Sequence, residues 1–126
     1  MAGASLAVEI TASVENMLEK ISGNKVAVIV EGKKDKAALE KIGIQNKIFV
    51  LNTKPLFVVA EEIAKSYGEA VILTDLDTEG KKLYGKLNTL LQGLGVKVDN
   101  GLRNFLFKNT KLRQIEGIGK LVIQPE

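Results

Sequence analysis

The sequence predicts a three-layer α/β fold, in which a mainly parallel sheet of about four strands is flanked by helices. Two observations lead to this prediction. Short apolar segments rich in β-branched residues alternate along the chain with longer segments of helical periodicity. The first short segment, residues 26–30, is apolar at every position. Such continuous apolarity is typical of a strand buried on both faces of a parallel sheet.

The length of 126 residues fits one globular domain. We expect residues 1–126 to form a single domain, with an N-terminal helix at 4–22, a core at 25–100 and a basic C-terminal helix and tail at 101–126. No stretch has the composition of a linker or a disordered segment.

The first half of the chain begins with an amphipathic helix that ends at Gly23. Two strand–helix units follow it, and Pro55 stands where the first turn of a helix tolerates proline. The elements are expected at residues 4–22 (helix), 26–30 (strand), 34–42 (helix), 47–51 (strand) and 56–67 (helix).

The second half continues the alternation, ending in a polar and basic helix. The elements are expected at residues 70–74 (strand), 78–91 (helix), 96–98 (short edge strand), 103–112 (helix) and 120–123 (candidate terminal strand). Right-handed crossovers place the loops that follow parallel strands at one edge of the sheet, where such folds bind ligands. The loops leaving the first and third strands are therefore the candidate site.

The composition restricts the chemistry of such a site. The chain contains no cysteine and no histidine, which excludes thiolate nucleophiles, histidine acid/base catalysis and an ordinary zinc site. Carboxylates, lysines, hydroxyls and metals that prefer oxygen ligands remain. The net charge of +3 is a mild bias toward anionic partners.

The sequence predicts a cytoplasmic protein without a membrane partner. No apolar run approaches the length of a membrane span, and the N-terminus lacks a basic region followed by an apolar block. The lack of cysteine suits a reducing compartment.

The first buried strand leads directly into Glu31-Gly32-Lys33-Lys34-Asp35. Glycine allows the backbone a sharp turn, and the free N–H groups of the helix that follows favour an anion at the same opening. Alternatively, this segment is a solvated turn, with Asp35 favourably placed in the first turn of a helix.

The third strand leads into Asp75-Leu76-Asp77. Residues two apart at a strand end point the same way, so Asp75 and Asp77 could share one cation. Two carboxylates without nearby His or Cys favour Mg²⁺ or Mn²⁺ over zinc. Alternatively, Asp77 or Thr78 caps the following helix, an explanation that accounts for one carboxylate but not for two.

If the first and third strands are neighbours, Glu31, Asp75 and Asp77 meet at one point of the sheet edge. Three carboxylates repel one another there unless a divalent ion lies between them. Lysines 33, 34, 81 and 82 flank the cluster, two at the start of each helix. A metal ion flanked by lysines is suited to binding a phosphate group.

These residues resemble the Toprim family, which is shared by topoisomerases, bacterial-type primases, overcoming-lysogenization-defect nucleases and the ribonuclease that matures bacterial 5S ribosomal RNA. The family's strand ending in Glu-Gly matches VAVIVEG at residues 26–32, and its strand ending in Asp-x-Asp matches ILTDLDTEG at residues 72–80. The order and the spacing, with one strand–helix unit between the motifs, also fit. The resemblance implies a Rossmann-like Toprim fold.

The resemblance also implies roles for individual residues. Glu31 would be the acid/base group in phosphodiester chemistry, and Asp75 and Asp77 would be magnesium ligands. Asp35 matches the second acidic position of the Glu-Gly-x-x-Asp form found in primases and the ribosomal RNA nuclease. The chain is most similar to small stand-alone Toprim proteins, whose nearest functional relative is that nuclease. The nuclease carries an additional domain that has no counterpart here, which leaves catalysis open.

The resulting expectation is a Mg²⁺-dependent nuclease, with RNA favoured over DNA and a homodimer or a larger complex left open. The expected nucleic-acid contacts are Gly32, Lys33, Lys34, Gly80, Lys81, Lys82, Arg103, Lys108, Lys111 and Arg113. The basic residues of the tail are interleaved with Phe105 and Phe107, an arrangement that can hold single strands.

Two alternatives remain. One is a non-catalytic RNA-binding module of a larger complex, in which the tail supplies the contacts. The other is a haloacid-dehalogenase-type phosphatase, in which Asp75 would be the nucleophile and Asp77 the general acid. That family's motif normally opens the chain, and the phosphatase alternative leaves VEGKKD unexplained.

Overall fold

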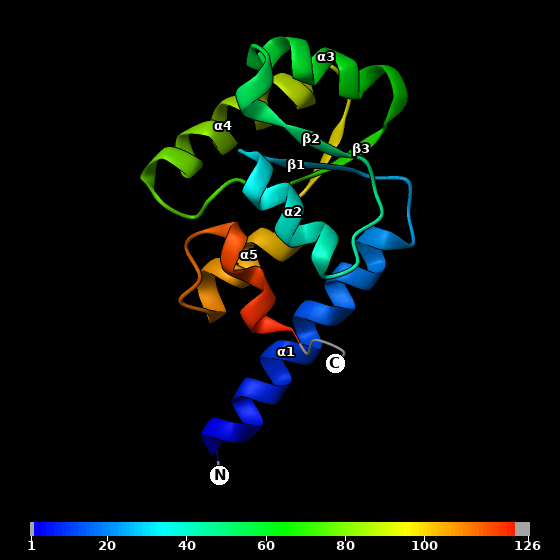
Figure 1. Ribbon diagram of the computed structural model, residues 1–126. Helices are drawn as coiled ribbons and strands as arrows, with labels where there is room; N and C mark the ends of the chain where they lie inside the picture. The colour runs from blue at the N-terminus through cyan, green and yellow to red at the C-terminus, as the bar shows by residue number, and fades with distance from the viewer. Residues whose placement is uncertain (1, 123–126) are drawn as a thin grey trace.

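Four parallel strands form the central sheet in the order β2-β1-β3-β4 (Figure 1). The computed structural model describes residues 2–122. The strands are β1 (Ala27–Val30), β2 (Ile48–Val50), β3 (Glu69–Ile72) and β4 (Lys97–Asp99). The helices are α1 (Ala2–Ser22), α2 (Lys33–Lys41), α3 (Leu56–Ser66), α4 (Thr78–Gly93) and α5 (Gly101–Asn109), with short 3₁₀ helices η1 (Leu51–Thr53) and η2 (Ile115–Leu121).

Helices cover both faces of the sheet, so the predicted three-layer α/β fold is confirmed (Figure 1). Ala27 and Ile29 of β1 pack with α3 and α4 on one face, whereas Val28 and Val30 pack with α1, α2, α5 and η2 on the other. Successive residues of a strand point to opposite faces, which explains why β1 is apolar at every position. The sheet therefore has two hydrophobic cores.

The register places the ends of the two motif-bearing strands side by side. Ile29 of β1 pairs with Phe49 of β2 on one side and with Ile72 of β3 on the other. The strands are parallel, so the loops that follow β1 and β3 leave from the same edge. The predicted adjacency of the first and third strands is confirmed.

The C-terminal tail differs from the prediction. The candidate strand at residues 120–123 is wrong, because residues up to Leu121 belong to the 3₁₀ helix η2 and residue 123 lies outside the described part of the chain. In a 3₁₀ helix, residues three apart face the same side. Ile115 and Ile118 are therefore both fully buried, packed in the core that includes α2.

The last α-helix also ends earlier than predicted, at Asn109 instead of residue 112. Thr110 turns the chain out of the helix: its hydroxyl donates to the Leu106 carbonyl oxygen (2.7 Å) and accepts from the N–H of Leu112 (3.1 Å). The segment beyond the helix then runs in extended form back to the sheet edge. There the N–H of Leu76 donates to the Arg113 carbonyl oxygen (2.7 Å).

Across residues 2–122, no helix is both long and apolar enough to span a membrane.

Candidate metal centre

Glu31 and Asp75 meet at the carboxyl edge of the sheet. Glu31 directly follows β1, and Asp75 stands three residues after β3. The backbone N–H of Asp75 donates to Glu31 Oε1 (3.2 Å). Each residue is partly exposed, so the two carboxyl groups stand at the surface of the edge while apolar strand residues lie buried behind them.

Two groups bond to Asp75 and hold it in position. The backbone N–H of Ile115 donates to Asp75 Oδ1 (2.9 Å), and Arg103 Nη2 donates to the Asp75 carbonyl oxygen (2.9 Å). Arg103 also lies 3.3 Å from Thr74 Oγ1, which in turn donates to the Gly80 carbonyl oxygen (2.7 Å). η2 thus holds the Asp75 carboxylate, and α5 holds the Asp75 backbone.

The start of α4 packs directly on the Asp75 peptide, and only glycine fits at the contact. A Cβ atom at Gly80 would lie 1.9 Å from the Asp75 carbonyl oxygen. Gly32, in contrast, has extended backbone torsions, and a Cβ there would meet its nearest neighbour, Asn52 Nδ2, at 3.6 Å. The steric need for glycine in the two motifs therefore lies at Gly80.

Asp77 has a structural role at the start of α4. It is exposed and serves as the N-cap of α4, where its Oδ1 accepts from the N–H of Gly80 (2.8 Å). Within residues 2–122, no three acidic side chains are arranged to hold one ion. Asp77 thus caps α4, and its negative charge also contributes to raising the pKa of Glu31, so its place beside Glu31 and Asp75 as a ligand stays a prediction.

Asp35 lies on the other side of Glu31, in the first turn of α2. It is buried, with 8% of its surface exposed, and its Oδ2 accepts from the N–H of Gly32 (3.0 Å). This carboxylate both caps its helix and faces the site.

The carboxyl groups alter one another's protonation. Burial, followed by the negative charge of Asp75, raises the pKa of Glu31 above its ordinary value, although the Asp75 N–H works in the opposite direction. Burial also raises the pKa of Asp35, assisted by the charges of Asp75 and Glu116 and opposed by backbone hydrogen bonds from Gly32 and Glu116. An added cation would relieve this repulsion.

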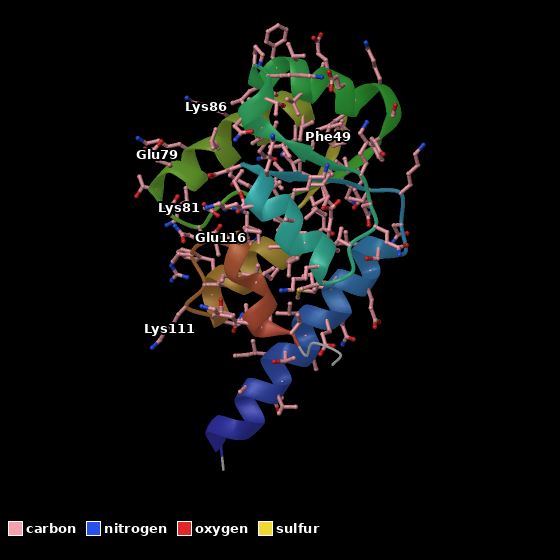
Figure 2. The ribbon with its side chains drawn as sticks, in the orientation of Figure 1. Phe49, Glu79, Lys81, Lys86, Lys111 and Glu116 are labelled. Carbon is pink, nitrogen blue, oxygen red and sulfur yellow. The ribbon has the colours of Figure 1, made fainter. Side chains whose placement is uncertain are left out.

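Sequence reasoning missed Glu116, Asn52 and Gln114. They line a cleft of about 630 Å³ together with Glu31, Asp35 and Asp75. Figure 2 shows Glu116 near the start of α2, on the same side of the molecule as Lys81. The apolar Ile115 and Ile118 on either side of Glu116 could have indicated a buried turn, but no local pattern places that turn at the sheet edge.

The cleft fits Mg²⁺ as an open site. All of its acidic donors are carboxylate oxygens, which hard divalent cations prefer. Mg²⁺ is usually bound by one or two carboxylates, several waters and substrate phosphates, so Glu31 and Asp75 suffice as its protein ligands. Asp35 stands behind them, and Asp77 stands at the start of the adjacent helix.

The predicted lysines are all exposed, and two of them stand at this cleft. Lys33 and Lys34 line it. Lys81 lies over the ring of Phe107 at 4.4 Å, and the Arg113 guanidinium lies 5.0 Å from the same ring. Lys82 lies 3.8 Å from Glu79 in an exposed pair. Lys108 and Lys111 are exposed as well.

Arg103 requires a correction. It is one of the expected nucleic-acid contacts, but only 8% of its surface is exposed, which leaves little of it for a nucleic acid to contact. Its guanidinium lies 4.4 Å from the Tyr84 ring and is bonded to Thr74 and Asp75. The helix buries this residue together with Leu102 and Leu106, so Arg103 supports the Asp75 backbone from the buried side.

Residues 25–100 match the family model of the Toprim domain. The chain belongs to the Toprim family. The match contains both motifs, so it includes Glu31, which the phosphatase alternative leaves without a role. The C-terminal segment that holds Asp75 in place, from Arg103 onward, lies outside the residues matched to the Toprim domain.

Relatives of this Toprim protein come from archaea and bacteria. A UPF0292 protein of Pyrococcus horikoshii is 42% identical over 107 residues, covering 85% of this chain and 80% of the relative. A UPF0292 protein of Methanocaldococcus jannaschii is 31% identical over 79% of this chain and 80% of its own length. A solved structure of a protein from Aquifex aeolicus superimposes with a TM-score of 0.68 at 29% identity, covering 90% of this chain and 94% of that one.

Gly80→Ala should destabilise the protein by about 2 kcal/mol or more, because the added methyl group overlaps the Asp75 peptide. Gly85→Ala is the matched control in the same helix: nothing lies within 4 Å of its Cβ position, and alanine favours helix. The free energy of unfolding, measured in urea, checks both variants. Equal stabilities would contradict the close packing at Gly80.

The metal-free protein should become more stable as the pH falls from neutrality toward the raised pKa of Glu31. The folded state takes up this proton at higher pH than the unfolded chain does, so protonation favours folding. Glu31→Gln keeps an acceptor for the Asp75 N–H and should make the free energy of unfolding depend less on pH. Glu61→Gln, on the exposed surface of α3, should leave this pH dependence unchanged. Urea unfolding in EDTA across this pH range measures the slopes, and equal slopes in the two variants would contradict the account.

Proposed function

We propose that this Toprim protein is a Mg²⁺-dependent nuclease that cleaves nucleic-acid phosphodiester bonds, with RNA favoured over DNA. The observation that carries the proposal is the contact between Glu31 and Asp75 at the mouth of an acidic cleft flanked by lysines. The family membership supports an activity that involves metal and nucleic acid. We further propose that residues 1–126 act as one domain in the cytoplasm, as a homodimer or within a larger complex.

Glu31 is the proposed acid/base group. Burial and the charge of Asp75 raise its pKa, which brings the carboxyl closer to the neutral range in which it can exchange a proton. Its Oε1 is held by the Asp75 N–H, which fixes the carboxyl at the cleft. Glu31 would take a proton from the attacking water or give one to the leaving oxygen.

Glu31 and Asp75 would hold the magnesium ion, with Asp35 and Asp77 as outer partners. A bound Mg²⁺ supplies charge neutralisation at the non-bridging phosphate oxygens. Asp75 is suited to this role because Ile115 and Arg103 fix its carboxylate and its backbone. Few degrees of freedom then remain to be lost when the ion binds.

The exposed lysines would hold the substrate. Lys33 and Lys34 stand at the N-terminus of α2 and line the cleft, where ammonium groups and free backbone N–H groups both favour a phosphate. Lys81 stands in the first turn of α4 and is kept in place by the ring of Phe107. These contacts attract phosphates of any base sequence.

A second candidate is a non-catalytic RNA-binding module. The hydrogen bonds of the carboxylates favour it. A backbone N–H donates to each of the four acidic side chains, Glu31, Asp35, Asp75 and Asp77. All four therefore stabilise loops or helix ends. In that case the acidic residues organise the fold, and the surrounding lysines bind RNA without cleavage.

Glu31→Gln should reduce Mg²⁺-dependent cleavage by roughly 10²- to 10⁴-fold, the usual contribution of a general acid or base. Binding should persist, because the surrounding lysines are unchanged. Labelled structured RNA and single-stranded DNA, incubated with Mg²⁺ or EDTA, report cleavage and binding from the same samples. Glu61→Gln, which changes the same chemical group on the exposed surface of α3, is the matched control.

Binding without cleavage by the wild-type protein, at every Mg²⁺ and Mn²⁺ concentration, would establish the binding module. Cleavage that Glu31→Gln leaves intact would remove Glu31 from the reaction. If neither nucleic acid bound, the proposal would fail as a whole.

A further inference from the structure

The surface between α2 and the C-terminal segment forms a second, larger hollow of about 990 Å³. We propose that this basic groove binds the phosphodiester backbone of single-stranded nucleic acid that extends from the acidic cleft. The proposal rests on the proposed function of that cleft, and it adds the path of the bound strand.

Five cations line the basic groove: Lys34 and Lys41 of α2, Lys111 and Arg113 of the loop after α5, and Lys120 of η2. All five are exposed. The acidic residues lining it are Asp77 and Glu116, so positive charge predominates. Among the residues that the structure describes, none of the five cations takes part in a salt bridge. Arg113 Nη1 donates to the carbonyl oxygens of Thr110 and Leu112, which orient its guanidinium. No carboxylate neutralises these charges within the described residues, so they can attract an anionic chain.

The groove and the acidic cleft are continuous. Lys34, Gln114 and Glu116 line both hollows, so they form a shared wall. A strand with one phosphate beside Glu31 could therefore pass along this wall into the groove. Figure 2 shows Glu116 and Lys111 on the same side of the molecule.

The groove is suited to the backbone of a strand rather than to its bases. Ala37, Ala38, Leu112 and Leu121 form its apolar part, and no aromatic side chain lines it. Stacked bases need an aromatic platform, whereas phosphates need cations. Recognition in the groove should therefore depend little on base sequence.

Single strands fit the hollow better than a duplex. The groove is concave, with α2 on one side and the segment around η2 on the other. One flexible backbone can enter such a hollow, whereas a duplex presents a wide convex surface with two backbones. The exposed Phe107, which holds Arg113 by its guanidinium, keeps this cation at the groove without lining it.

Most of the cations of the groove lie outside the residues matched to the Toprim domain. Lys111, Arg113 and Lys120 lie beyond residue 100, where the match to the Toprim domain ends. The C-terminal segment thus contributes three of the five cations, and it also carries Ile115, whose N–H binds Asp75. One segment therefore connects the strand path to the metal centre.

The test combines Lys41→Gln with Lys120→Gln, because both lysines line the groove and neither lines the acidic cleft. Lys65→Gln combined with Lys97→Gln is the matched control, with the same loss of charge on the exposed surfaces of α3 and β4. Fluorescence anisotropy with labelled single-stranded RNA and DNA of about a dozen nucleotides gives the affinity over a range of salt concentrations. Unlabelled duplex of the same sequence serves as a competitor.

The groove variant should bind single strands roughly tenfold more weakly than the control. Its plot of log affinity against log salt should be shallower by about 1.4, which is about 0.7 for each lost phosphate contact. The thermal unfolding midpoints of the two variants should agree, and cleavage of a dinucleotide, which is too short to reach the groove, should be unaffected.

The outcomes separate this proposal from the proposed function. If the groove variant and the control bind single strands equally while the wild-type protein cleaves RNA or DNA, the groove does not bind the strand. The proposed nuclease activity is then unaffected. Duplex that competes as well as single strands would overturn the assignment of a single strand. If the wild-type protein binds no oligonucleotide at all, both proposals fail.

Discussion

Burial of carboxylates, reinforced by their mutual repulsion, is the main energetic cost at the carboxyl edge of the sheet, and backbone N–H groups of the surrounding loops counter it. The ends of β1 and β3 and the first turn of α2 bring Glu31, Asp75 and Asp35 into one cleft, and Glu116 adds a further charge from η2. Each of the first three accepts a hydrogen bond from a backbone N–H. These bonds lower the pKa values of Glu31 and Asp35, whereas burial and the neighbouring negative charges raise them, and the net direction is upward for both groups.

The C-terminal segment holds Asp75 in place, although it lies outside the residues matched to the Toprim domain. Arg103 holds the Asp75 backbone from the buried side, and the N–H of Ile115 holds its carboxylate. The same segment is anchored by Ile118, which is fully buried in the core. Packing of the core and orientation of the site are therefore coupled, and residual repulsion at the site is a cost that the core must outweigh.

The features that the sequence predicted well are those encoded locally. The fully apolar run at residues 26–30 indicated a strand buried on both faces, and the two acidic strand ends indicated the edge where Glu31 and Asp75 meet. The features that the sequence predicted poorly are those that depend on tertiary contacts. Arg103 reads as a surface cation in a basic helix, and its burial follows only from its place behind Thr74. Glu116 belongs to a segment without helical or strand periodicity, so no pattern could bring it to the cleft.

The central claim is that Glu31 and Asp75 together bind a divalent cation. A crystal grown with Mn²⁺ tests it directly, because the anomalous signal of manganese locates the ion independently of the protein density. The account predicts one peak at about 2 Å from carboxylate oxygens of both residues, the usual distance for such ligands. A peak elsewhere, or a cleft without an ion while Asp75 keeps its bond to the Ile115 N–H, would contradict it.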